Sequence, residues 1–332
     1  MKLVSPLRYP GGKAGLTPFL TDVLDLNDLR GVDYYEPYAG GAGAALGLLG
    51  DNVVNTVSIN DSDYRIYAFW STILNEPSWF AEKIIAAQLN LAEWHHCREI
   101  CLDPTNRPLR EVGFASFYLN RCNRSGVINA GPIVGYEQQG EWRLGVRFTK
   151  SVLAERVFQI SRFRDRIFVS NLDAIDFLKR TLPRGKSRTR TFVYLDPPYV
   201  INGQRLYQNA YQKEEHAPIA NHMRRQKLLP WVMSYDNSEL VACLYSSEQI
   251  ALMPINYSLQ DKRSANELVI APHRLRLPRT LRIGARRFDI KAIINRKGAP
   301  DQQQSSADLS CLSGFGSQPI PAMSRRCSKP LR

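Results

Sequence analysis

The chain has 332 residues, 44% of them hydrophobic, and carries a formal net charge of +13. Its length and composition are those of a globular protein with an ample core, and the lack of any run of about 18 apolar residues argues against a membrane span. The N-terminus has no signal-peptide core, and six scattered cysteines without zinc-like spacing predict reduced thiols and no metal site. We therefore expect a cytoplasmic protein whose charge suits a polyanionic partner.

The first motif reads RYPGGK over residues 8–13. An aromatic residue, a glycine pair and a lysine precede a predicted helix, which by itself fits an ordinary loop and helix start. The motif gains meaning from the segments that follow it.

A glycine loop follows the first predicted strand. Residues 32–36 form this strand, PYAGGAG occupies residues 37–43, and helix-forming residues continue to 49. Strand, glycine turn and helix together are the nucleotide-binding start of a doubly wound α/β sheet, and glycines let the backbone approach a ligand closely. The loop lacks the Gly-Lys-Ser/Thr ending of a phosphate-binding P-loop and the regular glycine spacing of a dinucleotide-binding fingerprint. Glu36 suits a cationic amino-acid headgroup better than a pyrophosphate.

A second predicted strand, residues 57–61, ends in Asp61. It lies about 20 residues after the glycine turn, the spacing at which a carboxylate reaches ribose hydroxyls. Because a helix is predicted over 64–74, an N-cap role also fits Asp61, and the two roles can coexist.

A long insertion, residues 64–165, separates this strand from the next predicted one. Its tryptophans lie on predicted helices and are expected to pack a core. The segment 117–126 leads into a glycine-rich stretch, 129–145, that predicts a hairpin surrounded by arginines. Arginine can bind guanine bidentately or grip phosphates, although a phosphate contact or a surface ion pair is the more common role of any single one. The arginines are Arg121, Arg124, Arg143 and Arg147.

The most informative motif is DPPY at residues 196–199, directly after an apolar run, 191–195, that predicts a buried strand. The prolines make the turn stiff and leave its carbonyls free to accept hydrogen bonds. A planar amine held between Asp196 and the Pro197 carbonyl, with Tyr199 against its ring, could be methylated on nitrogen. Upstream, a strand over 166–170 leads to Asp173, which fits a helix N-cap.

The C-terminal segment is strongly basic. Residues 274–332 have a net charge of +10, from 10 Arg and 3 Lys against 3 Asp, and include the run DQQQSS at 301–306. This composition predicts a poorly ordered, solvated tail, with a nonspecific DNA-tethering arm as the alternative.

In this order, the motifs resemble those of the Dam-type, alpha-ordered DNA N6-adenine methyltransferases, over roughly residues 5–272. SYDN at 234–237 and NELVI at 266–270 resemble the strand motifs that follow DPPY in that family. The resemblance implies a Rossmann-like, doubly wound α/β methyltransferase sheet. Residues 1–63 and 166–272 would form the catalytic domain, 64–165 a mostly helical target-recognition insertion, and 273–332 a poorly ordered basic tail.

The resemblance also implies the reaction. S-adenosylmethionine would methylate the N6 amine of adenine in double-stranded DNA, at a specific sequence and with base flipping. Catalysis falls to Asp196, Pro197 and Tyr199, with Tyr199 stacking on the base. The residues expected to bind the cofactor are Tyr9, Lys13, Glu36, Gly40, Gly41, Gly43, Asp61 and Asp173, with Asp173 near the adenine of the cofactor. The residues expected to bind DNA are Arg121, Asn123, Arg124 and Arg143.

Several alternatives stay open at this point. N4-cytosine methyltransferases are close but more often begin the turn with Ser, and protein-glutamine enzymes begin it with Asn. An RNA amine methyltransferase could share the sheet, and a catalytically silent DNA-binding module would be expected to lose Asp196 or the glycine loop. The family's aromatic-Asn-Gly is replaced by NRSG at 123–126, so the recognised sequence is open, as are a partner restriction endonuclease and the oligomeric state.

Overall fold

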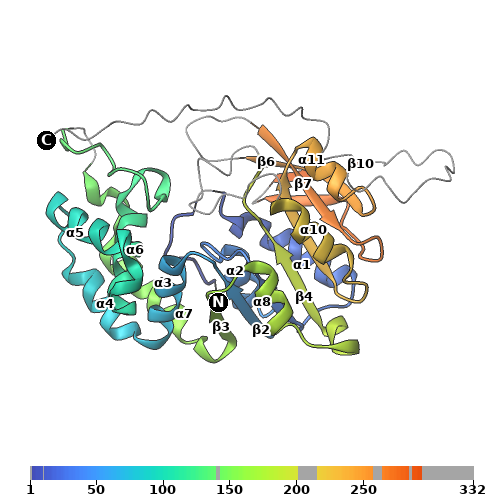
Figure 1. Cartoon of the computed structure of the whole chain (residues 1–332), viewed down its shortest axis with the longest axis horizontal. Coiled ribbons are helices and arrows are strands. Elements are labelled where there is room, and N and C mark those ends of the chain that lie inside the picture. Colours follow the sequence, from blue (N-terminus) through green and yellow to red (C-terminus); the bar gives the residue numbers. More distant parts are fainter. Residues whose placement is uncertain are drawn as a thin grey trace, which may run out of the picture. The chain divides into compact units, whose positions relative to one another are not determined.

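The computed structural model describes residues 2–9, 11–139, 143–200, 215–256, 264–283 and 286–293. Residues 1–294 form one compact unit around a central sheet (Figure 1). The strands of that sheet are β1 (Asp33–Glu36), β2 (Thr56–Asn60), β3 (Ile167–Ser170), β4 (Thr191–Leu195), β5 (Trp231–Asp236), β6 (Gln249–Asn256), β7 (Ser264–Ala271) and β10 (Lys291–Ile293).

The eight strands lie in the order β10-β6-β7-β5-β4-β1-β2-β3. β1 pairs in parallel with β2 on one side and with β4 on the other, and the outer pairs β2–β3 and β4–β5 are also parallel. β7 runs antiparallel to both β5 and β6. The chain changes direction across the sheet between β1 and β4, and such a switch point opens a ligand crevice at the carboxyl ends of the strands.

Helices cover both faces of the sheet, which confirms the predicted doubly wound α/β class. On β1, Tyr34 packs into the cluster that contains the helices α1 (Thr17–Leu26) and α2 (Gly43–Gly50). Its neighbour Tyr35 points to the opposite face and contacts Phe177, with ring centroids 6.2 Å apart. That second face is covered by α8 (Ala174–Thr181), α10 (His216–Arg224) and α11 (Glu239–Leu244). The alternation along each strand therefore fills two cores.

The predicted insertion is helical. Between β2 and β3 the chain forms α3 (Tyr64–Asn75), α4 (Pro77–Ala86), α5 (Leu91–Leu102), α6 (Leu109–Cys122) and α7 (Lys150–Ser161). α3 packs on α6, and α4 packs on α7. Trp70 and Trp94 are fully buried, and Trp79 is partly buried against the same core. No helix in the described part of the chain is long and apolar enough to cross a membrane.

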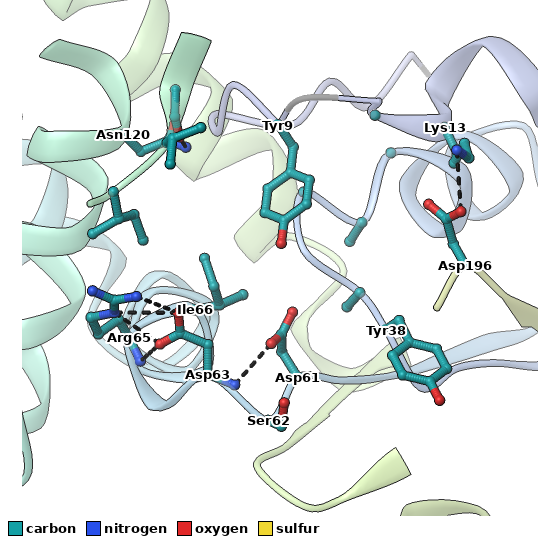
Figure 2. Close-up of a pocket in the computed structure, with 18 of the residues that line it drawn as sticks. Tyr9, Lys13, Tyr38, Asp61, Ser62, Asp63, Arg65, Ile66, Asn120 and Asp196 are labelled. Atoms are coloured by element: carbon teal, nitrogen blue, oxygen red, sulfur yellow. Dashed lines mark hydrogen bonds and ion pairs between the residues drawn. The ribbon is translucent and has the colours of Figure 1, made fainter. Parts of the chain in front are cut away.

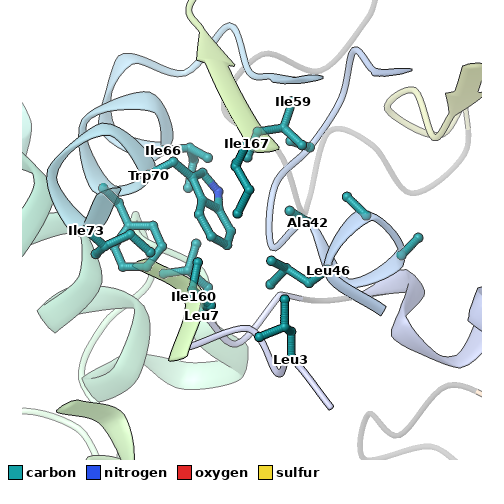
Figure 3. Close-up of a cluster of buried hydrophobic side chains, with 14 of the residues drawn as sticks. Leu3, Leu7, Ala42, Leu46, Ile59, Ile66, Trp70, Ile73, Ile160 and Ile167 are labelled. Atoms are coloured by element: carbon teal, nitrogen blue, oxygen red, sulfur yellow. The ribbon is translucent and has the colours of Figure 1, made fainter. Parts of the chain in front are cut away.

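The insertion and the sheet share one hydrophobic core (Figure 3). Trp70 of α3 and Ile160 of α7 belong to the same buried cluster as Leu46 of α2 and Ile59 of β2. The N-terminal segment adds Leu7. Burying apolar side chains from all these elements together fixes the insertion against the catalytic sheet, since each buried large side chain contributes about 1.5–3 kcal/mol.

Short 3₁₀ helices connect the longer elements. Two of them flank the glycine-rich stretch, where a hairpin was predicted. They are η1 (Lys13–Leu16), η2 (Pro104–Asn106), η3 (Arg124–Gly126), η4 (Leu144–Arg147), η5 (Arg164–Arg166) and η6 (Gly185–Arg190).

The hairpin prediction is wrong for the described residues 129–139 and 143–145, which contain no strand. The chain instead pairs with the end of α6. Ile133 N donates to Cys122 O at 2.8 Å, Arg124 N donates to Gly131 O at 3.1 Å, and Asn123 and Pro132 form an isolated bridge. The glycines thus let the stretch turn back onto α6 rather than pair with itself.

The predicted tail boundary is also wrong. After residue 273 the chain forms β8 (Thr280–Ile283) and β9 (Arg286–Asp289), which pair with each other, and then β10, which pairs antiparallel with β6. Leu275 is buried, and the Asn27 side chain bonds both the N–H and the carbonyl of Arg276 at 2.9 and 2.8 Å. Buried apolar contacts and strand pairing therefore order this segment despite its positive charge. Residues 294–332 lie outside the described residues.

Three of the cysteines, Cys97, Cys101 and Cys122, are buried free thiols, as predicted. Cys311 and Cys327 lie outside the described residues.

Candidate active site

A pocket lies at the switch point, where the carboxyl ends of β1, β2 and β4 meet (Figure 2). β1 ends in Glu36, β2 leads into Asp61, and β4 leads into Asp196. The rest of the wall comes from the N-terminal motif, the glycine loop, the start of α3 and the loop after α6. The lining residues are Tyr9, Gly12, Lys13, Glu36, Tyr38, Ala39, Gly41, Ala42, Gly43, Asp61, Ser62, Asp63, Arg65, Ile66, Asn120, Gly126, Val127, Ile128, Asn129, Asp196 and Pro198.

The glycine loop is shaped around Tyr9. Gly40 has a φ of +46°, and a Cβ there would lie 2.6 Å from the Tyr9 ring. A Cβ on Gly41 would lie 3.0 Å from Tyr9 Cβ. From the insertion, Trp70 Nε1 donates to Gly40 O at 2.9 Å, which holds the turn. Gly41 and Gly43 line the pocket while Gly40 supports the ring of Tyr9, so the glycines serve a contact within the chain as well as any ligand.

Asp61 bridges two backbone amides at the pocket wall. Its Oδ2 accepts from Gly40 N and its Oδ1 from Asp63 N, both at 2.9 Å. Burial raises the pKa of Asp61 to about 7, and the nearby Asp63 adds to the rise while these two amides oppose it. The helix N-cap is Asp63, which accepts from Arg65 N, so the N-cap interpretation of Asp61 is wrong.

Glu36 is a buried carboxyl with few partners. Its Oε2 accepts from the Tyr34 hydroxyl at 2.9 Å, and its side chain is 2% exposed. Burial raises the pKa of Glu36 to about 8, against the opposing effect of the Tyr34 hydrogen bond. The carboxyl is therefore harder to ionise than an exposed one, and a cation in the pocket would favour its charged form.

Asp196 is held by one of its two oxygens. Oδ1 lies 3.1 Å from Lys13 Nζ and accepts from Ser234 Oγ at 2.8 Å. Burial raises the pKa of Asp196 to about 6, while Lys13 and Ser234 oppose the rise. Ser234 is a site residue that the motif analysis noted only as part of a strand ending.

Tyr199 does not face the pocket. Its side chain is 4% exposed and packs in the core on the α10 and α11 face. Its hydroxyl lies 2.5 Å from Lys13 Nζ and donates to Glu267 Oε1. Pro197 and Tyr199 are not lining residues, whereas Pro198 is. Glu267 was missed as a site residue, although it lies in the segment that resembles the family's last strand.

Asp173 lies outside the pocket lining. It is the exposed N-cap of α8, and its Oδ1 accepts from Ile175 N at 2.8 Å and from Asp176 N at 3.2 Å. The N-cap interpretation is confirmed, and the pocket gives no support to a contact between Asp173 and the cofactor.

The four residues expected at the DNA divide into two pairs. Asn123 is fully buried and accepts from Trp94 Nε1 at 2.6 Å while it donates to Val127 O and Ile128 O. Arg121 donates to the carbonyls of Arg147 and Pro6. These two side chains are engaged within the chain and hold the loop together. Arg124 and Arg143 are exposed and stay available.

Arg121 belongs to a cluster of arginines beside the pocket. Burial and repulsion from Arg8, Arg156 and Arg147 lower its pKa to about 10. Within the described part of the chain, none of these four forms an ion pair with a carboxylate. An uncompensated cluster of this kind favours an anionic ligand.

Asn120 connects the N-terminal motif to the loop after α6. Its Oδ1 accepts from Arg8 N at 2.7 Å, and its Nδ2 donates to Arg8 O at 2.6 Å and Gly126 O at 2.7 Å. A Cβ on Gly126 would lie 2.3 Å from Arg8 O. Sequence reasoning missed Asn120, because a polar residue inside a helix carries no local sign of contacts with a segment 112 positions away.

A model of the D12 class N6 adenine-specific DNA methyltransferase family matches residues 9–256. No curated protein matches the chain. Among solved structures, a conserved hypothetical protein from Streptococcus pyogenes is similar at 10% identity with a TM-score of 0.32, over 74% of this chain and 89% of that one. At this TM-score the likeness carries no argument.

Proposed function

The chain belongs to the D12 class N6 adenine-specific DNA methyltransferases, and from this premise we propose that its methyl donor is S-adenosylmethionine and that it flips an adenine out of a specific sequence in double-stranded DNA. It is an enzyme, and DNA is its substrate. The observation that carries the proposal is the meeting of two acidic strand ends, Glu36 and Asp196, in one pocket at the switch point of the sheet. The Dam-type subdivision stays a prediction.

The side chains of the pocket fit S-adenosylmethionine. Glu36 is a buried carboxyl that a cationic amino group would ionise, and Asp61 is placed to accept from ribose hydroxyls. The rings of Tyr9 and Tyr38 line the pocket and offer faces for a sulfonium. When bound, the cofactor supplies a methyl group activated on sulfur.

Asp196 and Pro197 polarise the amine in this proposal. The carboxylate and the Pro197 carbonyl accept the two N–H groups of adenine N6, which favours a more tetrahedral nitrogen whose lone pair points along the line of attack. Positioning and electrostatics supply the rate, and no general base is needed before transfer.

Flipping the adenine costs a few kcal/mol, which stacking in the pocket offsets in part. Stacking by Tyr199 would require its buried ring to move, so we assign the stacking surface to Tyr38 and Pro198, which line the pocket.

DNA recognition is assigned to residues 64–165, and methyl transfer to 1–63 together with 166–272, now extended through β10. Arg124 and Arg143 are the exposed candidates for base edges. The arginine cluster of Arg8, Arg147 and Arg156 suits phosphates of the target strand. A restriction endonuclease of the same specificity would be a partner, and cleavage of unmethylated but not methylated DNA by cell extract would reveal it.

The test is product analysis. The purified protein is incubated with methyl-labelled S-adenosylmethionine and either random duplex DNA or RNA, and the nucleosides are identified by mass spectrometry. We expect N6-methyladenine in DNA within one sequence context, and none with Asp196→Ala. N4-methylcytosine or methylated RNA would reassign the substrate, and DNA binding without transfer would indicate a silent binding module.

A further inference from the structure

We propose that Lys13 is a positioning residue for methyl transfer: its ammonium group, anchored by Glu267, fixes Oδ1 of Asp196 and keeps that carboxylate ionised, which leaves Oδ2 to accept the adenine amine. The inference rests on the proposed role of Asp196, and it replaces the expected contact between Lys13 and the cofactor.

The three donors of the Lys13 ammonium are already engaged. Nζ lies 3.1 Å from Asp196 Oδ1, 3.4 Å from Glu267 Oε1 and 2.5 Å from the Tyr199 hydroxyl. The Lys13 side chain is 7% exposed, and that of Glu267 only 1%. An ammonium has three hydrogens, so this arrangement leaves none for a ligand.

The partners of Asp196 are arranged unevenly. Ser234 Oγ, which is itself 2.7 Å from the Tyr194 hydroxyl, donates to the same Oδ1 that Lys13 contacts. Within the described residues, no group hydrogen-bonds Oδ2. One oxygen is thus fixed by the protein, and the other is open toward the pocket that Asp196 lines.

Asp196 needs this counter-ion because its surroundings favour the protonated form. Burial raises its pKa to about 6, repulsion from Glu267 adds to the rise, and Lys13 is the strongest opposing influence. Burial also raises the pKa of Glu36, the other carboxyl that faces this centre from β1. Without Lys13, Asp196 would take up a proton near neutrality and lose acceptor strength.

Lys13 itself stays charged. Burial opposes the charge, but Asp196 and Glu267 outweigh it and raise the pKa of the ammonium above its ordinary value. A protonated lysine cannot accept the proton that the methylated amine releases, so the geometry favours a positioning role over that of a base.

The experiment compares two variants that should move the pH profile in opposite directions. Single-turnover methyl transfer is measured from pH 5.5 to 9 for the wild type, Lys13→Met and Glu267→Gln, with cofactor affinity measured by calorimetry. We expect Lys13→Met to lower the rate at pH 7 by about tenfold or more and to move the acid limb upward by about one pH unit, with cofactor affinity nearly unchanged. Glu267→Gln removes a repelling carboxylate and should move the acid limb downward. Lys13→Arg should restore the wild-type limb.

Two results would overturn the inference. A merely structural network would slow the reaction at every pH without moving the limb in either variant, and a cofactor ligand would weaken cofactor binding in Lys13→Met by more than about tenfold while the rate constant held. If Lys13→Met does not fold, Lys13→Gln takes its place, with the same upward movement of the acid limb expected and its absence overturning the inference. If the wild type transfers no methyl group, the proposed function fails, and the Asp196 midpoint in ¹³C NMR spectra, assigned with Asp196→Asn, still tests the counter-ion in both variants.

Discussion

Two walls of the pocket are built by different means. The strand-end wall, Glu36, Asp61 and Asp196, consists of carboxyl groups at the carboxyl ends of parallel strands, and burial raises the pKa of each. The loop wall, residues 120–129 at the end of α6 and just after it, is held by the amides of Asn120 and Asn123, whose hydrogen-bonding groups are engaged within the chain. The sheet thus presents reactive groups, whereas the loop uses its polar groups to hold its own shape.

The largest expected effect is on the strand-end wall. Asp196→Ala should lower methyl transfer by about 10²-fold or more, because an acceptor aimed at the reacting amine is lost. Cofactor affinity should stay largely intact. Rapid-quench assays measure the loss, with Asp176→Ala on α8 as the matched control. Transfer above a tenth of the wild-type rate would remove Asp196 from the catalytic role.

The next effect tests the loop wall. Asn123→Ala should lower the free energy of unfolding by about 2–3 kcal/mol, because Trp94 Nε1 and two backbone carbonyls lose their partner. Urea denaturation measures it. Asn106→Ala, at an exposed side chain, should cost less than about 0.5 kcal/mol. Equal stability of the two variants would mean that Asn123 does not hold the loop.

Specificity should lie in the exposed residues beside the loop wall. Arg124→Ala and Arg143→Ala should each relax the site preference by about 1–3 kcal/mol if the residue contacts a base edge. Methylation profiling on random DNA checks this, with the exposed Arg107→Ala as the control.

Deleting residues 295–332, which begin after β10, should weaken binding to all sequences alike and flatten its salt dependence. A changed motif in the deletion, or an unchanged one in both arginine variants, would contradict this division.

The smallest effect concerns protons at Glu36. Its folded-state pKa of about 8 lies above the ordinary value, so the native protein holds a proton that the unfolded chain has lost, and stability falls as pH rises from about 4.5 toward 8. Binding of a cationic amino group requires the ionised form. Cofactor affinity should therefore rise by about tenfold between pH 6 and 7, with proton release, below the pKa of an ordinary α-amino group.

Glu36→Gln separates this effect from others. The variant should lose most of the pH dependence of binding and should be more stable than the wild type at pH 8 by about 1–3 kcal/mol. Calorimetry in buffers of different ionisation enthalpy measures the released proton, and Asp61→Asn controls for the second carboxyl. Affinity that stays flat or falls with pH in the wild type would argue against Glu36 as the contact.

The strand-end wall could be predicted from the sequence because its information is local. An apolar run ending in an acid or in DPPY places the side chain at the carboxyl edge of a parallel sheet, and parallel strands bring those edges together. The helical insertion and the two-faced sheet follow from similar local patterns.

The remaining features depend on distant partners. Lys13 meets Glu267 across 254 positions, and the buried Tyr199 hydroxyl donates to the same carboxylate. The glycines at 131 and 135 indicated turns but not that the chain would return to α6. The high positive charge of residues 274–293 predicts a poorly ordered tail and gives no sign that Leu275, shortly before β8, is buried.

The amide of Asn120 also limits where this enzyme can vary. It satisfies Arg8 and Gly126 at once, and Gly126 can carry no side chain because the Arg8 carbonyl occupies that space. Position 120 therefore requires Asn and position 126 requires Gly, whereas any residue other than Pro at position 8 supplies the same backbone groups. Neither Asp nor Gln offers the donor, acceptor and reach of Asn120. Insertions between 120 and 126 should be rejected. Changes of sequence preference, natural or engineered, have room at exposed side chains such as Arg124 and from residue 131 onward, beyond the contacts of Asn120.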